Sequence, residues 1–250
     1  MGFYDLTKEE RLQKTEQIYS TILRHLEKNS GKPFPFFSDG DTYIRKSAYQ
    51  SVGKIFNQHP EMREQIIFLL EKSIVDKNNY IRQTTINAAG EIGMKHFTTV
   101  ESFFDRGLFD GHHSARNAVI GSIKKMGEKN PVPVLQWAKK YLHHPDKEIR
   151  REICHGIELR GRTHPEDILP LLKELQHDPT ATVRNTLVHV LGQISYKKNC
   201  LEKVILHLKK WENKDLATKA IIEIIDVHER YKDFAVLSQK EAKKYIDNNI

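Results

Sequence analysis

Cysteine is scarce in this sequence, whose 250 residues include only Cys154 and Cys200. Two cysteines build neither a disulfide framework nor a four-cysteine metal site, and such scarcity is typical of a reducing cytoplasm. Long apolar runs are also missing, so no stretch is expected to span a membrane. The N-terminal stretch MGFYDLTKEERLQKTEQ is charged and has no apolar centre, which argues against a secretory signal. We expect a cytoplasmic protein with no membrane partner.

The signatures of common enzyme classes are absent as well. The sequence contains no P-loop, no dinucleotide-binding fingerprint and no G-x-S-x-G motif. Histidine is plentiful, but the adjacent pairs His112-His113 and His143-His144 cannot easily face one metal ion from a single helix. We therefore expect no metal and no other cofactor, and the sequence leaves open whether the protein is an enzyme.

The composition is that of a folded protein with a modest excess of positive charge. Apolar residues make up 38% of the chain and charged residues 29%, which is compatible with a packed core and a well-solvated surface. Lysine and arginine number 40 against 33 acidic residues, a formal net charge of +7. This balance permits an anionic partner, such as nucleic acid, without requiring one.

One pattern recurs along most of the chain. An arginine preceded by isoleucine, valine or alanine returns after 37 residues and then three times after 34. These residues, which we call the ladder arginines, are Arg45, Arg82, Arg116, Arg150 and Arg184. Self-similarity at such a period is typical of a solenoid built from stacked repeats.

Each ladder arginine lies near the start of an amphipathic segment. In the segment TATVRNTLVHVLGQIS, apolar residues follow helical spacing and form one broad face. Further apolar helices lie between these segments. Three of the segments that carry a ladder arginine are preceded by an aspartate in an N-cap-like position, namely Asp41, Asp146 and Asp178. No stretch alternates like a half-buried strand. The sequence therefore predicts an all-α fold, a right-handed α-solenoid of stacked antiparallel helix pairs.

The repeats imply a simple domain organisation. We expect one domain over residues 1–250, monomeric, with an N-terminal helix and loop at 1–40, five clear repeats at 41–195 and a degenerate repeat with a C-terminal cap at 196–250. The connection at 29–41 contains Phe34, Phe36 and Phe37. Its phenylalanines are interpreted as a cover for the first repeat, with a mobile binding arm as the alternative.

Two resemblances follow from these motifs. An aspartate four or six residues before an arginine at the start of a helix, as at Asp41 and Asp178, is similar to the pattern of HEAT repeats and covers residues 41–195. From Arg150-Arg151 through Asp178-Pro179 and Val183-Arg184 to Trp211, the chain resembles the HEAT-like bacterial DNA alkylation-repair proteins. That resemblance implies a basic concave surface for duplex DNA. Glycosylases of this family excise cationic alkylpurines with aromatic residues and one carboxylate around the base, so the resemblance also implies such a set of residues.

The resemblance and the regular spacing of cations together suggest particular site residues. The candidate DNA contacts are Arg116, Arg150, Arg151, Arg184, Lys197 and Lys198. The nearest match to the family's carboxylate is Asp105, and Phe104 and Trp211 are candidate base-stacking residues. No tryptophan stands beside Asp105, and the family's downstream helix rich in histidine and arginine is missing.

Three functions remain open at this stage. The first is a DNA-associated HEAT-like repeat protein without catalysis, the second a protein-interaction scaffold, and the third an active alkylpurine DNA glycosylase. The pairing of the ladder arginines discriminates between the first two. Arginines bonded to acidic caps would stabilise the stack, whereas arginines without such partners would suit phosphates.

Overall fold

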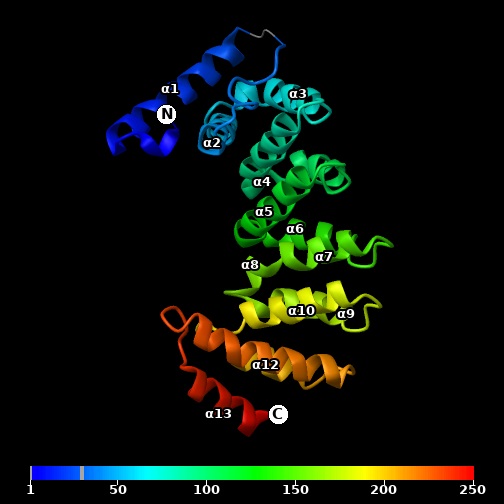
Figure 1. The fold of residues 1–250 in the computed structure, drawn as a ribbon. Helices are drawn as coiled ribbons and strands as arrows, with labels where there is room; N and C mark the ends of the chain where they lie inside the picture. Colours follow the sequence, from blue (N-terminus) through cyan, green and yellow to red (C-terminus); the bar gives the residue numbers. More distant parts are fainter. Residues whose placement is uncertain (1, 29–30) are drawn as a thin grey trace. The chain divides into compact units, whose positions relative to one another are not determined.

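The protein is described by a computed structural model that covers residues 2–28 and 31–250. Over these residues it contains helices and connections and no strand. The α-helices are α1 (Lys8–Glu27), α2 (Thr42–Gln58), α3 (Arg63–Ser73), α4 (Asn79–Leu108), α5 (His113–Lys129), α6 (Pro131–Lys139), α7 (Lys147–Gly156), α8 (Glu158–Gly161), α9 (Pro165–Glu174), α10 (Ala181–Gln193), α11 (Leu201–Leu208), α12 (Lys214–Arg230) and α13 (Gln239–Asn249). Two 3₁₀ turns, η1 (Phe3–Asp5) and η2 (Pro60–Met62), complete the element order (Figure 1). Among the described residues, no helix has the length and apolarity that a membrane span requires.

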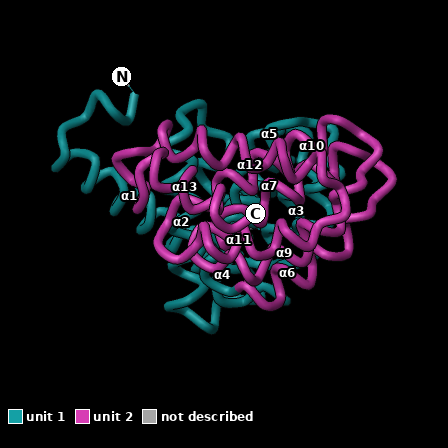
Figure 2. The backbone as a smooth tube through the Cα atoms, turned by 90° about the horizontal axis from the view of Figure 1, so that it is seen from below, with its two compact units in different colours: residues 1–130 teal, residues 131–250 magenta. Residues whose placement is uncertain are grey.

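The chain forms two compact units, residues 1–130 and 131–250 (Figure 2). Each unit is built from successive helix pairs, which confirms the predicted all-α solenoid of HEAT-like repeats. A single continuous domain and the right-handed sense of the solenoid stay predictions.

In the first unit, the helices that carry ladder arginines contact one another in succession, α2 with α4 and α4 with α5. Helix α1 packs on α2 and buries Ile18, Ile22 and Leu26. Helix α1 therefore pairs with α2 and contributes to the core of the first unit. Helix α4 runs from one repeat into the next with no loop between them. It is kinked at His96, whose φ of −127° and ψ of 52° lie outside the helical region.

In the second unit, two rows of helices run through the repeats. The ladder helices α7 and α10 contact each other, and α10 contacts α12 of the degenerate repeat. The second row consists of α9 and α11, and α13 contacts both α11 and α12. The division of residues 196–250 into a degenerate repeat and a C-terminal cap stays a prediction.

Three ladder arginines are followed eight residues later by a glycine, at Gly53, Gly90 and Gly192, and each of these glycines lies against the next helix of its row. A methyl group added at Gly53 would lie 2.5 Å from Cβ of Glu91, and one added at Gly192 would lie 2.7 Å from Cγ of Glu223. Because helix interiors otherwise disfavour glycine, close packing explains why it recurs there.

The phenylalanine-rich connection contributes to the core of the first unit. Asn29 and Ser30 of this segment lie outside the described residues. Phe34 and Phe37 are buried with ring centroids 5.0 Å apart, and the carbonyl of Phe37 accepts a hydrogen bond from Thr84. The described part of the segment is thus packed against the repeats, as the covering interpretation requires.

Candidate functional site

The five ladder arginines share one contact. In every repeat, Nη1 of the arginine donates to the carbonyl oxygen of the residue six positions earlier. The bonds of 2.5 to 2.8 Å run from Arg45 to Asp39, from Arg82 to Asp76, from Arg116 to Asp110, from Arg150 to His144 and from Arg184 to Asp178. The guanidinium group therefore ties the start of its helix to the preceding turn.

The residue that supplies this carbonyl also shapes the turn with its side chain. In all five repeats its side chain accepts a hydrogen bond from the backbone N–H two residues later. The acceptors are Asp39, Asp76, Asp110, His144 and Asp178, at 2.8 to 3.1 Å. Such Asx-type turns compete with helix formation and so set the point at which the helix begins. Asp178 is thus a turn residue, and Thr180 takes the N-cap position of α10 that we had expected for Asp178.

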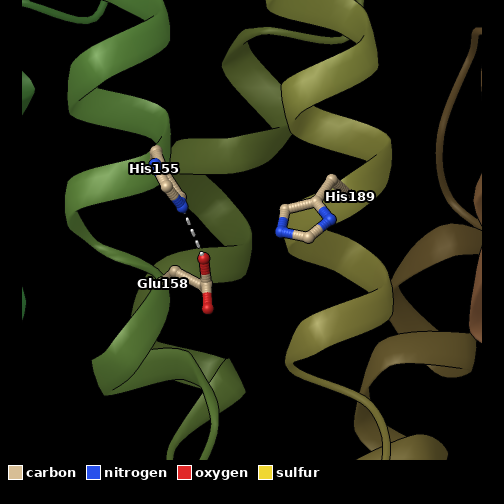
Figure 3. Close-up of side chains that lie close together, drawn as sticks. All are labelled: His155, Glu158 and His189. Atoms are coloured by element: carbon tan, nitrogen blue, oxygen red, sulfur yellow. Dashed lines mark ion pairs between the residues drawn. The ribbon is translucent and has the colours of Figure 1, made fainter. Parts of the chain in front are cut away.

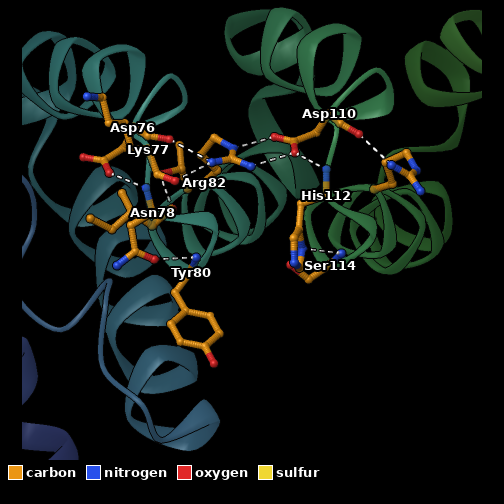
Figure 4. Close-up of polar contacts among 11 residues, drawn as sticks. Asp76, Lys77, Asn78, Tyr80, Arg82, Asp110, His112 and Ser114 are labelled. Atoms are coloured by element: carbon orange, nitrogen blue, oxygen red, sulfur yellow. Dashed lines mark hydrogen bonds and ion pairs between the residues drawn. The ribbon is translucent and has the colours of Figure 1, made fainter.

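Two aspartates connect successive ladder arginines within a unit. Asp110 accepts from Nε and Nη2 of Arg82 at 2.7 and 2.9 Å, while its carbonyl accepts from Arg116 (Figure 4). Asp178 accepts from Nε and Nη2 of Arg150 at 2.6 and 3.1 Å, while its carbonyl accepts from Arg184. Bidentate geometry of this kind gives strong, directional bonds, and we call each arrangement an Arg–Asp relay.

The electrostatics of the relay aspartates follow from these bonds. Burial by itself raises the pKa of Asp178, but hydrogen bonds from Arg150 and Thr180 lower it below the usual 3.8. The same balance of burial against bonds from Arg82 and the His112 N–H lowers the pKa of Asp110. Both carboxylates are therefore charged at neutral pH and compensate the arginines that they hold.

Arg45 and Arg184 are bound differently. Arg45 is 7% exposed, donates to the carbonyls of Asp39 and Gly40, and stacks over the ring of Tyr80 at 4.4 Å. Arg184 is half-buried, and its Nη1 donates a hydrogen bond to the carbonyl oxygen of Asp178. Over the described part of the chain, no carboxylate is within ion-pair distance of Arg184.

Arg184 borders a small polar hollow between α10 and α12. The hollow has a volume of about 250 Å³. Its lining includes Lys219, Asn185, Asn213 and Asp215 beside Arg184. We call this feature the Arg184 pocket. Two cations and two amides against one carboxylate make it suitable for a single anionic group.

The other predicted DNA contacts either bond to groups of the protein itself or lie on the surface. Arg151 donates to Glu148 at 2.8 Å and lies 3.6 Å from Glu152. Lys197 donates to the carbonyl of Phe234, and Lys198 is exposed. Arg116 belongs to an Arg–Asp relay, as described above.

The residues predicted for catalysis and base stacking lie in different surroundings. Asp105 is half-buried on α4 in the first unit. Phe104 is fully buried and stacks on Phe97 at 5.9 Å, and Trp211 is 1% exposed with its indole N–H bonded to His207. Neither ring faces solvent, where a base would have to stack. These positions therefore suit packing, not base recognition.

One cluster among the described residues has the donor atoms of a metal site. His155, Glu158 and His189 each offer a ligand atom, and these atoms lie within 4.8 Å of one another (Figure 3). The sequence drew attention only to the adjacent histidine pairs, and this cluster was not predicted. Its signal was present, because His155 and His189 each follow a ladder arginine by five residues.

Comparison with known proteins adds little to this geometry. No family model matches the chain, and no curated protein matches it. This chain is similar to a crystal structure of the Escherichia coli protein YibA, with a TM-score of 0.48 and 19% sequence identity. The alignment covers 90% of this chain and 77% of the YibA chain. A designed armadillo repeat protein in complex with the peptide (KR)4 aligns over 85% and 98% at 15% identity and a TM-score of 0.39. The CpcE–CpcF complex of phycocyanin lyase from Nostoc aligns over 94% and 82% at 13% identity and a TM-score of 0.35. These scores are too low to support an argument about function.

Proposed function

We propose that this protein is a non-catalytic interaction scaffold that binds an acidic segment of a protein partner. In this proposal, the Arg184 pocket receives a carboxylate group of that segment. The net charge of +7 favours such a partner at long range. Repeat folds suit this role because they present side chains from successive helices along one surface.

The contacts of the ladder arginines carry the proposal. Arg82 and Arg150 are neutralised by Asp110 and Asp178, and Arg45 is buried against backbone carbonyls and an aromatic ring. Arg184 differs from these three because no carboxylate of the described residues lies within ion-pair distance of it and because it lines a pocket with Lys219. One pocket with two cations fits a local anionic contact better than a continuous line of phosphates.

DNA binding would call for a row of cations that face solvent along the duplex. Arg150 is only 8% exposed and is held by Asp178, and Arg151 is paired with Glu148. An alkylpurine glycosylase would additionally need an accessible aromatic ring, and Phe104 and Trp211 are buried. For these reasons we rank DNA binding second and catalysis third among the proposals.

A direct test compares two ligands with the full chain. A fluorescein-labelled glutamate-rich peptide and a labelled DNA duplex are titrated with protein while fluorescence anisotropy is followed. We expect the peptide to bind, and R184Q and K219Q each to weaken it about tenfold, the usual loss for one charged hydrogen bond. Added salt should weaken binding at this partly exposed pocket.

The matched control is K243Q, which removes the same charge from an exposed lysine on α13. It should change peptide affinity by less than about twofold, as expected for a site outside the pocket. Binding of duplex DNA with a steep salt dependence, together with no binding of the peptide, would establish DNA as the partner. A loss of peptide affinity as large for K243Q as for R184Q would mean that only net charge matters.

A further inference from the structure

The two histidines of the cluster occupy equivalent positions in successive repeats. With the ladder arginine counted as position 0, His155 on α7 and His189 on α10 both stand at position +5. The same position of the degenerate repeat is Glu223 on α12. Since α7 contacts α10 and α10 contacts α12, the three side chains form a row across neighbouring helices. The imidazole centroids are 6.1 Å apart, and Nδ1 of His189 is 3.9 Å from Oε1 of Glu223.

Glu158 completes the cluster from a position that is glycine in three of the other ladder repeats, at Gly53, Gly90 and Gly192. It stands eight residues after Arg150, where α7 has ended and α8 begins. Its side chain is 2% exposed, with Oε2 3.2 Å from Nε2 of His155. Its Oε1 accepts from Nε and Nη2 of Arg162 at 3.0 and 2.5 Å, and Nη2 also donates to Gln193. One carboxylate oxygen is thus anchored while the other is aimed at the histidines.

We propose that His155, Glu158 and His189 form a binding site for a divalent transition-metal ion, with Zn²⁺ as the best match. Two imidazoles and one carboxylate are a common three-ligand set for zinc, with the remaining coordination left to water. Tetrahedral zinc with bonds of 2.0 to 2.2 Å places its ligand atoms about 3.3 to 3.6 Å apart. The His155–Glu158 pair, at 3.2 Å, is already close to this separation. Binding therefore calls mainly for an inward movement of the His189 ring.

The surroundings of the cluster match those of metal sites in two ways. Metal-binding histidines usually place their second ring nitrogen near a carboxylate, and Glu223 lies beside Nδ1 of His189 in this manner. The histidines also border an open polar hollow of about 400 Å³ between α7 and α10, lined by Arg151, Thr182, Asn185 and Thr186 as well. Their side chains are 34% and 44% exposed, so an ion can enter from solvent.

The test measures metal affinity in the full chain, without a histidine tag. Zinc binding is followed by calorimetry and by competition with a chromophoric chelator. Cobalt is then added as a spectroscopic probe, because bound Co²⁺ absorbs visible light in a way that depends on its ligands. We expect one Zn²⁺ per chain, with H155A and H189A each weakening affinity by about 100-fold or more, beyond the usual effect of an outer-shell change.

Two further variants separate metal binding from general effects. E223Q should weaken zinc binding about tenfold through the orientation of His189, which makes Glu223 a positioning residue. H177A removes an exposed histidine of the same unit outside the cluster and should leave affinity unchanged. The proposal is overturned if the H155A/H189A double variant, folded by circular dichroism, binds zinc as tightly as the wild type or retains the cobalt spectrum.

Discussion

Removal of the Asp178 carboxylate is the most direct test of the Arg–Asp relay. In D178A, Arg150 keeps its bonds to two backbone carbonyls but loses both bonds to the carboxylate. The side chains of Arg150 and Asp178 are 9% and 3% exposed, so an uncompensated charge would remain in a site shielded from water. Breaking a buried ion pair on one side typically costs about 3 to 5 kcal/mol. We expect a loss of stability in this range at neutral pH.

The protein offers a convenient reporter for this experiment. Its two tryptophans, Trp137 and Trp211, are both buried in the second unit, which also contains Asp178. Tryptophan fluorescence during urea denaturation therefore follows the unit in which the change is made. D226A, at an exposed position of α12, is the control and should change stability by less than about 0.5 kcal/mol.

A double-mutant cycle distinguishes the relay from two independent residues. R150M and D178A each break the pair, whereas the double variant leaves no uncompensated charge behind. We expect the double variant to be more stable than the sum of the single losses predicts, by at least about 1.5 kcal/mol, the value of a hydrogen bond to a charged group. Strictly additive losses would refute the relay as a coupled structural unit.

The relay also predicts a dependence of stability on pH. The pKa of Asp178 is lowered in the folded protein, so its contribution is present above the unfolded pKa of about 3.8. The contribution is lost as the pH falls through the folded pKa, when the carboxylate becomes protonated. Urea titrations at pH 5 and pH 3 should therefore show a larger loss of stability for the wild type than for D178A. Equal losses would contradict the assignment of a lowered pKa.

Three further outcomes are expected from other buried residues. G192V should destabilise the second unit by about 1 to 3 kcal/mol in urea denaturation, because the added atoms overlap Glu223 on the neighbouring helix. Burial raises the pKa of the thiols of Cys154 and Cys200, so neither should react with a thiol reagent in the native protein, although both should react after unfolding. Burial lowers the pKa of His228 in the folded protein. The free energy of unfolding should therefore fall as the pH drops below about 6.5, because the unfolded chain then binds a proton that the folded chain excludes. The H228Q variant should show a smaller decline.

The repeat architecture could be predicted because packing imposes the same residues in each repeat. Position 0 needs a guanidinium long enough to reach back to the preceding turn, and position +8 is glycine in three of the five ladder repeats, where two helices approach. Both demands recur with the period of the fold and are therefore visible in the sequence. The departure at Glu158 was equally visible, and it coincides with the end of α7.

The pairing of the arginines was harder to predict. The aspartates that hold Arg82 and Arg150 follow them by 28 residues, in the turn of the next repeat. Sequence spacing identifies them as candidates, but only the stacking of neighbouring helices brings the charges together. The exposure of an aromatic ring is likewise a property of the packed repeats, which is why Phe104 and Trp211 could not be separated from surface rings in advance.

The position of a residue within its repeat predicts its role better than its charge does. Position +5 lies about 140° around the helix from position 0, since each residue of an α-helix advances by about 100°. The ladder arginines therefore point to the turns, while position +5 points to a different face. In the first unit this position is occupied by Gln50, Asn87 and Gly121, whereas the second unit has His155, His189 and Glu223. Substitutions of Arg82 and Arg150, the position 0 residues that are held by aspartates, should chiefly change folding stability. Substitutions at position +5 of the second unit should change ligand binding with little effect on stability.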